Sequence, residues 1–150
     1  YRLLCDADLS VPIEQVERFL PPLGPDADIV FGSRETPTAS RIGEPLRRHF
    51  MGRAFNWLVA LLAVPGLADT QCGFKCFRAE AAQDLFPRLT LDGFAFDVEL
   101  FHLARKGGLS YSEVGVDWYY RSQSKVRPFQ DAFAMTFDLL KVRWRHRDSH

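Results

Sequence analysis

Residues 1–8 read Tyr-Arg-Leu-Leu-Cys-Asp-Ala-Asp, and residues 28–32 read Asp-Ile-Val-Phe-Gly. Each contains a short apolar run of the length that buried strands have. The segment between them predicts a helix that begins at a Ser10 cap and ends near Leu20, ahead of a cluster of prolines and a glycine. A strand, a helix and a strand in succession favour an α/β fold with a mostly parallel mixed sheet.

The chain starts without Met, and its first five residues are typical of an interior parallel strand, which needs neighbours on both sides. We therefore expect residues 1–150 to form one domain whose first strands lie upstream. The alternation of elements continues along the chain. A loop is expected over residues 33–43, helices over 45–63, 79–86, 97–106 and 128–147, and strands at the end of 69–77 and over 109–118.

The composition is that of a globular domain. A hydrophobic content of 47% with 13 phenylalanines excludes a disordered, collagen-like or coiled-coil chain. The 19 basic and 19 acidic residues balance, so no overall positive field indicates a nucleic-acid partner. Cys5, Cys72 and Cys76 include no CxxC pair, which argues against a disulfide framework or a zinc ribbon. Cys72 and Cys76 are expected to be small core residues.

Asp6 and Asp8 stand two residues apart, just after the first apolar run. In α/β proteins, ligands bind outside the carboxyl ends of the strands, so we expect both carboxylates at that edge of the sheet. Carboxylate oxygens suit Mg²⁺ or Mn²⁺, and such a metal usually also binds a diphosphate. The alternative is a turn in which Asp8 helps to cap the following helix.

Two further segments carry acidic or amide side chains at element boundaries. Asp69 and Gln71 precede an apolar strand, together with Gly73. They indicate either ligand-binding groups or an Asx-turn at Asp69, with Gly73 needed for backbone geometry. Asp97 is either the N-cap of the next helix, with Glu99 as an acid of its first turn, or a side chain at the same edge as Asp8.

Basic residues gather in two further places. Arg34 follows the second strand, and Arg47 or Arg48 stands on the expected helix 45–63, so that two guanidinium groups are available to bind a phosphate. A solvated helix face is the alternative for the helical arginines. Ser124 and Lys125 lie in the polar, basic stretch 119–127, which is suited to closing over a diphosphate.

Several motifs, in this order and at these distances, carry a resemblance to a known family. They are DADLS (6–10), DIVFGSR (28–34), ADTQCGFKCFR (68–78), GFAFDVEL (93–100), EVGVDW (113–118) and SKV (124–126). Together they resemble the family-2 inverting glycosyltransferases, and within them most of all the dolichyl-phosphate β-glucosyltransferases and their bacterial polyprenyl-phosphate relatives. The resemblance implies the C-terminal part of a nucleotide-diphospho-sugar transferase fold of the GT-A type, without its nucleotide-recognising first strands.

The activity implied by the resemblance is the inverting, metal-dependent transfer of a hexose, glucose from UDP-glucose, to a polyprenyl or dolichyl phosphate. It implies that Asp6 and Asp8 bind Mg²⁺ or Mn²⁺, with Asp8 as the more direct ligand. Asp8 is also expected to contact the donor diphosphate, together with Ser124 and Lys125 in a loop that closes on the donor.

The remaining implied roles concern the acceptor and the sugar. Arg34 and Arg48 resemble the pair that binds the lipid phosphate, and Asp69 and Gln71 resemble residues that line the donor sugar. Asp97 matches the position of the family's catalytic base. A polyprenyl phosphate is already an anion, so its attack needs little proton abstraction, and we rank Asp97 below Asp8.

Two other functions remain open from the sequence. If the acceptor were a saccharide or another lipid hydroxyl, Asp97 would be essential, because a hydroxyl must lose its proton. A non-catalytic fragment is the other alternative. The helix over 128–147 carries an aromatic stripe and a basic end, which suits either core packing or binding to an anionic membrane surface. The resemblance implies a peripheral location at the cytoplasmic face of the endoplasmic reticulum or the bacterial plasma membrane.

Overall fold

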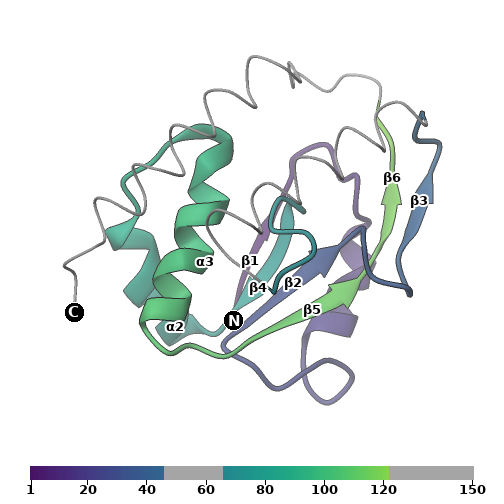
Figure 1. The fold of residues 1–150 in the computed structure, drawn as a ribbon. Helices are drawn as coiled ribbons and strands as arrows, with labels where there is room; N and C mark the ends of the chain where they lie inside the picture. The colour runs from purple at the N-terminus through teal and green to yellow at the C-terminus, as the bar shows by residue number, and fades with distance from the viewer. Residues whose placement is uncertain (46–65, 122–150) are drawn as a thin grey trace.

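The computed structural model describes residues 1–45 and 66–121. The helix expected over 128–147 lies outside the described residues, and so does the helix expected over 45–63 except for its first residue. The described part contains a four-stranded sheet in the order β1-β4-β2-β5 and a two-stranded sheet of β3 and β6 (Figure 1). The strands are β1 (Arg2–Cys5), β2 (Ile29–Ser33), β3 (Ser40–Ile42), β4 (Phe74–Phe77), β5 (Tyr111–Gly115) and β6 (Asp117–Tyr119).

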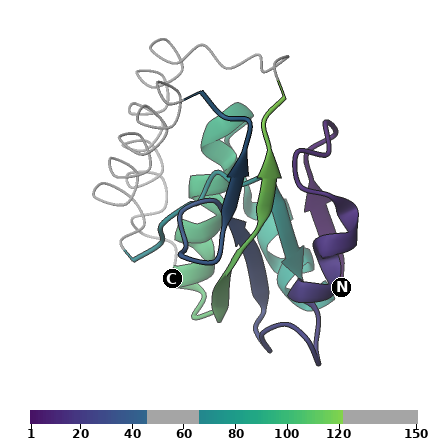
Figure 2. The ribbon, with the colours of Figure 1, turned by 90° about the vertical axis from the view of Figure 1, so that its right-hand side faces the viewer.

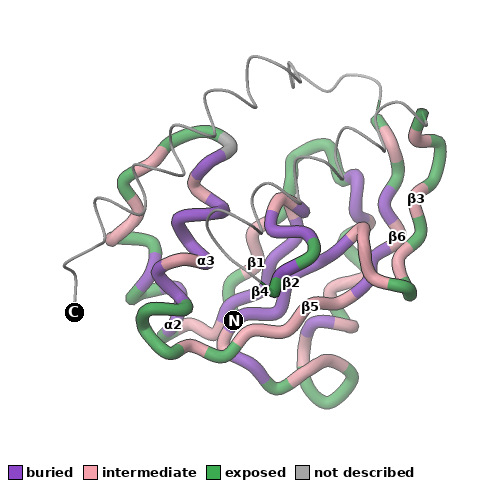
Figure 3. Tube along the Cα trace, in the orientation of Figure 1, coloured by how far each residue is buried: buried purple, intermediate pink, exposed green. Residues whose placement is uncertain are grey.

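The four-stranded sheet is mixed, as predicted. β2 and β5 pair in parallel, whereas β4 runs antiparallel to both of its neighbours, β1 and β2. β1, β2 and β5 therefore point in one direction, with β4 running against them. Among the described residues β1 is an edge strand, and both of its end residues, Arg2 and Cys5, are exposed. The central strands β2 and β4 are buried along their whole length (Figure 3).

The helix expected from Ser10 to Leu20 is shorter and tighter than predicted. It is a 3-10 helix, η1 (Ile13–Phe19), whose N-cap is Pro12. Ser10 is therefore not its cap. The backbone amide of Ser10 donates a hydrogen bond of 2.9 Å to Asp8 Oδ1, which forms a turn ahead of η1. This turn occupies the residues that the sequence assigned to the start of the helix.

The strand expected over residues 109–118 is divided into β5 and β6, which belong to different sheets. At the division, the chain from 36 to 39 packs directly against Gly115, where a Cβ would lie 2.3 Å from Thr38 Oγ1. Beyond it, β6 pairs in parallel with β3, which was not predicted and lies in the expected loop 33–43.

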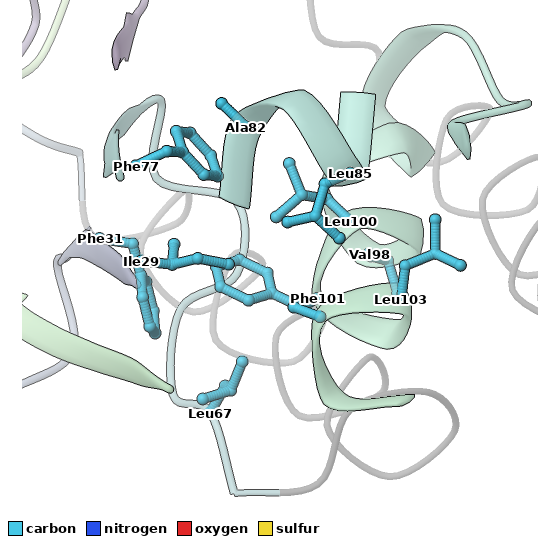
Figure 4. Packing of buried hydrophobic residues seen from close by; sticks show 11 residues of the cluster. Ile29, Phe31, Leu67, Phe77, Ala82, Leu85, Val98, Leu100, Phe101 and Leu103 are labelled. Carbon is cyan, nitrogen blue, oxygen red and sulfur yellow. The ribbon is translucent and has the colours of Figure 1, made fainter. Parts of the chain in front are cut away.

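Helices α2 (Ala79–Leu85) and α3 (Phe96–Lys106) confirm the helices expected over 79–86 and 97–106. They cover one face of the sheet and η1 covers the other (Figure 2). On the α3 face, the rings of Phe31 and Phe101 lie 4.6 Å apart between centroids (Figure 4). On the opposite face, Phe19 packs edge-on against Phe74. Alternate residues of the central strands thus fill two cores.

Candidate active site

Asp6 lies against the turn that leads into β4. The antiparallel register pairs Cys5 with Phe74, so the residue after β1 meets the residue before β4. The backbone amide of Asp6 donates a hydrogen bond of 2.8 Å to the Gly73 carbonyl. A Cβ on Gly73 would lie 2.0 Å from Asp6 Oδ2, so glycine is required for this approach. The structure therefore joins the Asp6–Asp8 motif to the motif around Gly73.

Lys75 is the centre of the site, and it is not among the predicted site residues. Its side chain is fully buried in β4, where Nζ donates a hydrogen bond of 2.6 Å to the Cys72 carbonyl. Nζ also forms an ion pair of 2.8 Å with Asp97 Oδ1, from the first turn of α3. The N-cap of α3 is Ala95, so Asp97 is not the cap. A charged residue between Phe74 and Cys76 was the only sequence signal for this role.

Asp69 is fully buried and is bound by Arg34. Arg34 donates to it from Nε at 2.7 Å, from Nη2 at 2.8 Å and from its backbone amide at 3.0 Å. Burial alone would raise the pKa of Asp69, but the Arg34 guanidinium outweighs it and lowers that pKa to about 2. Asp69 Oδ1 also accepts a hydrogen bond of 3.3 Å from the backbone amide of Gln71, as in an Asx-turn. The structure thus pairs a predicted sugar-lining residue with a predicted phosphate-binding residue.

Two glutamates that were not predicted as site residues hold the loops around this site. Glu113 of β5 accepts hydrogen bonds from the backbone amides of Ala68 and Asp69, at 3.2 and 3.0 Å. Glu99 is fully buried in α3 and accepts from the Thr90 hydroxyl at 2.7 Å and from the Leu91 amide at 2.9 Å. Glu99 therefore anchors the chain that precedes α3, instead of serving only as an acid of its first turn.

We call Asp6, Asp69, Lys75 and Asp97 the carboxylate–lysine cluster, because their charges act on one another. Partial burial raises the pKa of Asp6, and the Asp8 carboxylate raises it further, against smaller lowering effects of Lys75 and Arg34. Burial also raises the pKa of Asp97, although Lys75 acts in the opposite direction. Segments far apart in the sequence thus meet around Lys75.

The cluster and its neighbours carry an excess of negative charge. Within the part of the chain that the structure describes, Asp6, Asp69, Asp97 and the exposed Asp8 are accompanied by two cations, Lys75 and Arg34. An excess of two charges among oxygen ligands suits a hard divalent cation. In residues 1–45 and 66–121, no three His, Cys, Asp or Glu side chains are grouped as a complete metal site.

Two of the three cysteines in the described residues are buried in the core. Cys72 and Cys76 are buried, as predicted. Burial raises the pKa of the Cys72 thiol to about 12, so this thiol is protonated at neutral pH. The other predicted site residues, Arg48, Ser124 and Lys125, lie outside the described residues.

No family model matches the chain, but curated proteins do. A dolichyl-phosphate beta-glucosyltransferase of Dictyostelium discoideum is 37% identical over 123 residues, which cover 81% of this chain and 38% of that protein. One of Homo sapiens is 35% identical over 151 residues, which cover 96% and 47%. Glycosyltransferase AglD of Haloferax volcanii is 30% identical over 142 residues, which cover 93% and 22%.

The chain spans less than half the length of each of these relatives. The names of these relatives agree with the resemblance drawn from the motifs, and the α/β fold with a mixed sheet agrees with the GT-A type expected from it. Over nearly its whole length, the chain is similar in sequence to one part of the dolichyl-phosphate beta-glucosyltransferases.

Proposed function

We propose that this chain forms part of the catalytic site of an inverting glycosyltransferase that moves glucose from UDP-glucose to a polyprenyl or dolichyl phosphate. The observation that carries the proposal is the carboxylate–lysine cluster. In it, residues from motifs far apart in the sequence lie around one buried lysine. The names of the relatives support the lipid phosphate as acceptor and glucose as the sugar.

Asp8 and Asp6 are the residues that would hold a Mg²⁺ or Mn²⁺ ion in this function. Asp8 is exposed and uses Oδ1 to accept the Ser10 amide, which fixes the turn of this motif. A divalent cation would supply charge neutralisation to the leaving diphosphate. In this proposal Arg34 and Arg48 bind the acceptor phosphate, and Ser124 and Lys125 contact the donor diphosphate. Nε and Nη2 of Arg34 are bound to Asp69 in the structure.

A second acceptor class is favoured by one observation on Asp97. This carboxylate is buried and its pKa is raised, as is common for a general base. A base is needed when the acceptor is a hydroxyl of a saccharide or another lipid. A phosphate acceptor needs little proton abstraction, so the dependence of activity on Asp97 separates the two acceptor classes.

The protein would act at the cytoplasmic face of the endoplasmic reticulum or of a bacterial plasma membrane, because its acceptor is a membrane lipid. No described helix has both the length and the apolar character that crossing a membrane requires. The predicted helix over 128–147 is the proposed membrane-surface segment.

The test is a transfer assay on the intact protein. Radiolabelled UDP-glucose and GDP-mannose are offered separately to a short polyprenyl phosphate with Mg²⁺. Labelled lipid is expected from UDP-glucose, and Asp8→Ala is expected to abolish it. Asp26→Ala is the matched control, because Asp26 is an exposed aspartate that is ion-paired only with the surface residue Arg78. Absence of labelled lipid from both donors, in a folded protein that binds UDP, would contradict this acceptor.

A further inference from the structure

Arg34 binds Asp69 through one edge of its guanidinium group. Nε donates to Asp69 Oδ2 at 2.7 Å, and Nη2 donates to Asp69 Oδ1 at 2.8 Å. Nε of an arginine carries one hydrogen and each terminal nitrogen carries two. Both hydrogens of Nη1 and the second hydrogen of Nη2 therefore have no hydrogen-bond partner within residues 1–45 and 66–121. This second edge of the guanidinium group can bind two oxygens of one phosphate.

The exposed surface of this ion pair belongs to Arg34. The Arg34 side chain is 20% exposed, whereas the Asp69 side chain is 0% exposed. Asp69 Oδ2 also accepts the backbone amide of Arg34, and Oδ1 accepts the backbone amide of Gln71. A ligand can therefore contact the guanidinium group in this arrangement, but it cannot contact the Asp69 carboxylate unless the pair is rearranged.

Two further residues hold the pair in place. Glu113 accepts the backbone amide of Asp69 at 3.0 Å, which fixes the start of the Asp69 side chain. The ring of Trp118 in β6 is buried, and its centroid lies 5.6 Å from Arg34 Cζ, within the range of a cation–π interaction. Arg34 is thus ordered before a ligand arrives, so binding does not have to order a long side chain.

We propose that Asp69 is a positioning residue for the acceptor, which together with Trp118 orients Arg34 so that its Nη1–Nη2 edge binds the phosphate of the polyprenyl phosphate. This inference rests on the proposed function, in which Arg34 binds that phosphate. It gives Asp69 a role in acceptor binding in place of the predicted contact with the donor sugar.

The test measures the KM of each substrate separately in the intact protein. Asp69→Asn keeps the shape of the side chain but removes its charge and one hydrogen-bond acceptor. We expect this variant to raise the KM for a short polyprenyl phosphate by about tenfold or more, with the KM for UDP-glucose unchanged. Asp84→Asn is the matched control, because Asp84 forms an exposed ion pair with Arg88. It should change neither KM.

The opposite pattern would overturn the inference. A residue that lines the donor sugar affects the KM for UDP-glucose at least as much as the KM for the acceptor. Such a pattern in Asp69→Asn, or an unchanged KM for polyprenyl phosphate, leaves the proposed function intact but removes the positioning role of Asp69. A wild-type protein that transfers no glucose to polyprenyl phosphate overturns both.

A double variant tests whether Asp69 acts through Arg34. Arg34→Lys removes the planar fork and should also raise the KM for polyprenyl phosphate. If Asp69 only positions Arg34, Asp69→Asn should add little to the effect of Arg34→Lys. Effects that multiply, or an Arg34→Lys variant with the wild-type KM for polyprenyl phosphate, overturn the inference.

Trp118 provides a test that does not depend on the folding of Asp69→Asn. Trp118→Phe keeps an aromatic ring beside the guanidinium group, and Trp118→Leu does not. We expect a higher KM for polyprenyl phosphate in Trp118→Leu than in Trp118→Phe, and equal KM values for UDP-glucose. Equal KM values for polyprenyl phosphate in the two folded variants would overturn the part assigned to Trp118.

Discussion

The Asp6 carboxylate lies directly over Gly73, at the place where any other residue would have its Cβ. That Cβ would be 2.0 Å from Oδ2 and 2.1 Å from Cγ of Asp6. The backbone amide of Asp6 is bonded to the carbonyl of the same glycine. Asp6, a predicted metal ligand, can therefore take this position only because Gly73, the residue before β4, has no side chain.

Gly73→Ala should separate activity from stability. The three atoms nearest to the added methyl group belong to the Asp6 carboxylate, which can rotate away at a cost of about 1 kcal/mol. We expect transfer activity to fall as far as in Asp6→Ala, with a small change in the free energy of unfolding. Gly107→Ala is the control, because its Cβ would have an ordinary contact of 3.4 Å. Full activity of Gly73→Ala would show that the position of Asp6 is unimportant.

Lys75→Met should destabilise the protein by leaving buried Asp97 without its cation. Removal of one partner of a buried ion pair typically costs about 3–5 kcal/mol. Lys75→Met combined with Asp97→Asn should recover much of that loss, because both charges are then gone. Urea unfolding of the two single variants and the double variant measures the coupling. Additive losses would show that the two charges do not act on one another.

The Arg34–Asp69 pair predicts a dependence of stability on pH. The pKa of Asp69 is about 2 in the folded protein, below its ordinary value of 3.8, so its stabilising effect is full above the ordinary value and is lost as the pH falls through about 2. The shift corresponds to about 2 kcal/mol. The difference in unfolding free energy between wild type and Asp69→Asn should shrink by that amount between about pH 6 and pH 2. A constant difference would contradict the assigned pairing.

Asp97→Asn should distinguish the two acceptor classes. With a polyprenyl phosphate, the variant should keep most of the wild-type kcat, because the attacking oxygen is already ionised. With a hydroxyl acceptor, the loss of a general base should lower kcat by about 10²–10⁴-fold. The assay compares the variant and the wild type with each acceptor, at equal concentrations of folded protein.

Local signals in the sequence predicted much of the fold. The apolar run 28–32 became β2, and Gly107 and Gly108 end α3 as expected, with Gly108 at a φ of +68°. β3 and β6 were missed as separate strands because each is three residues long and pairs only with the other. The prediction of a helix from Ser10 to Leu20 was wrong at its start, where Asp8 accepts the Ser10 backbone amide in a turn. Apolar spacing does not reveal such a turn.

The sequence predicted the carboxylates of the candidate site but not the residues that hold them in place. Asp6, Asp69 and Asp97 stand in recognisable motifs, and the structure brings them to one lysine. Lys75 and Glu113 were missed because their partners are distant in sequence or belong to the backbone. The importance of a buried charge depends on its surroundings, and these exist only after folding.

The loop that contains Asp69 is held from two strands at once, by Arg34 just after β2 and by Glu113 within β5. These strands are neighbours in the sheet but lie far apart along the chain. The position of the loop therefore depends on contacts with residues that are distant in the sequence. We therefore expect this loop to reach its place only after the long-range parallel pairing of β2 and β5 has formed, because both of its anchors depend on that pairing. A slip of one residue in that pairing would turn Glu113 to the opposite face and leave a compact but inactive protein.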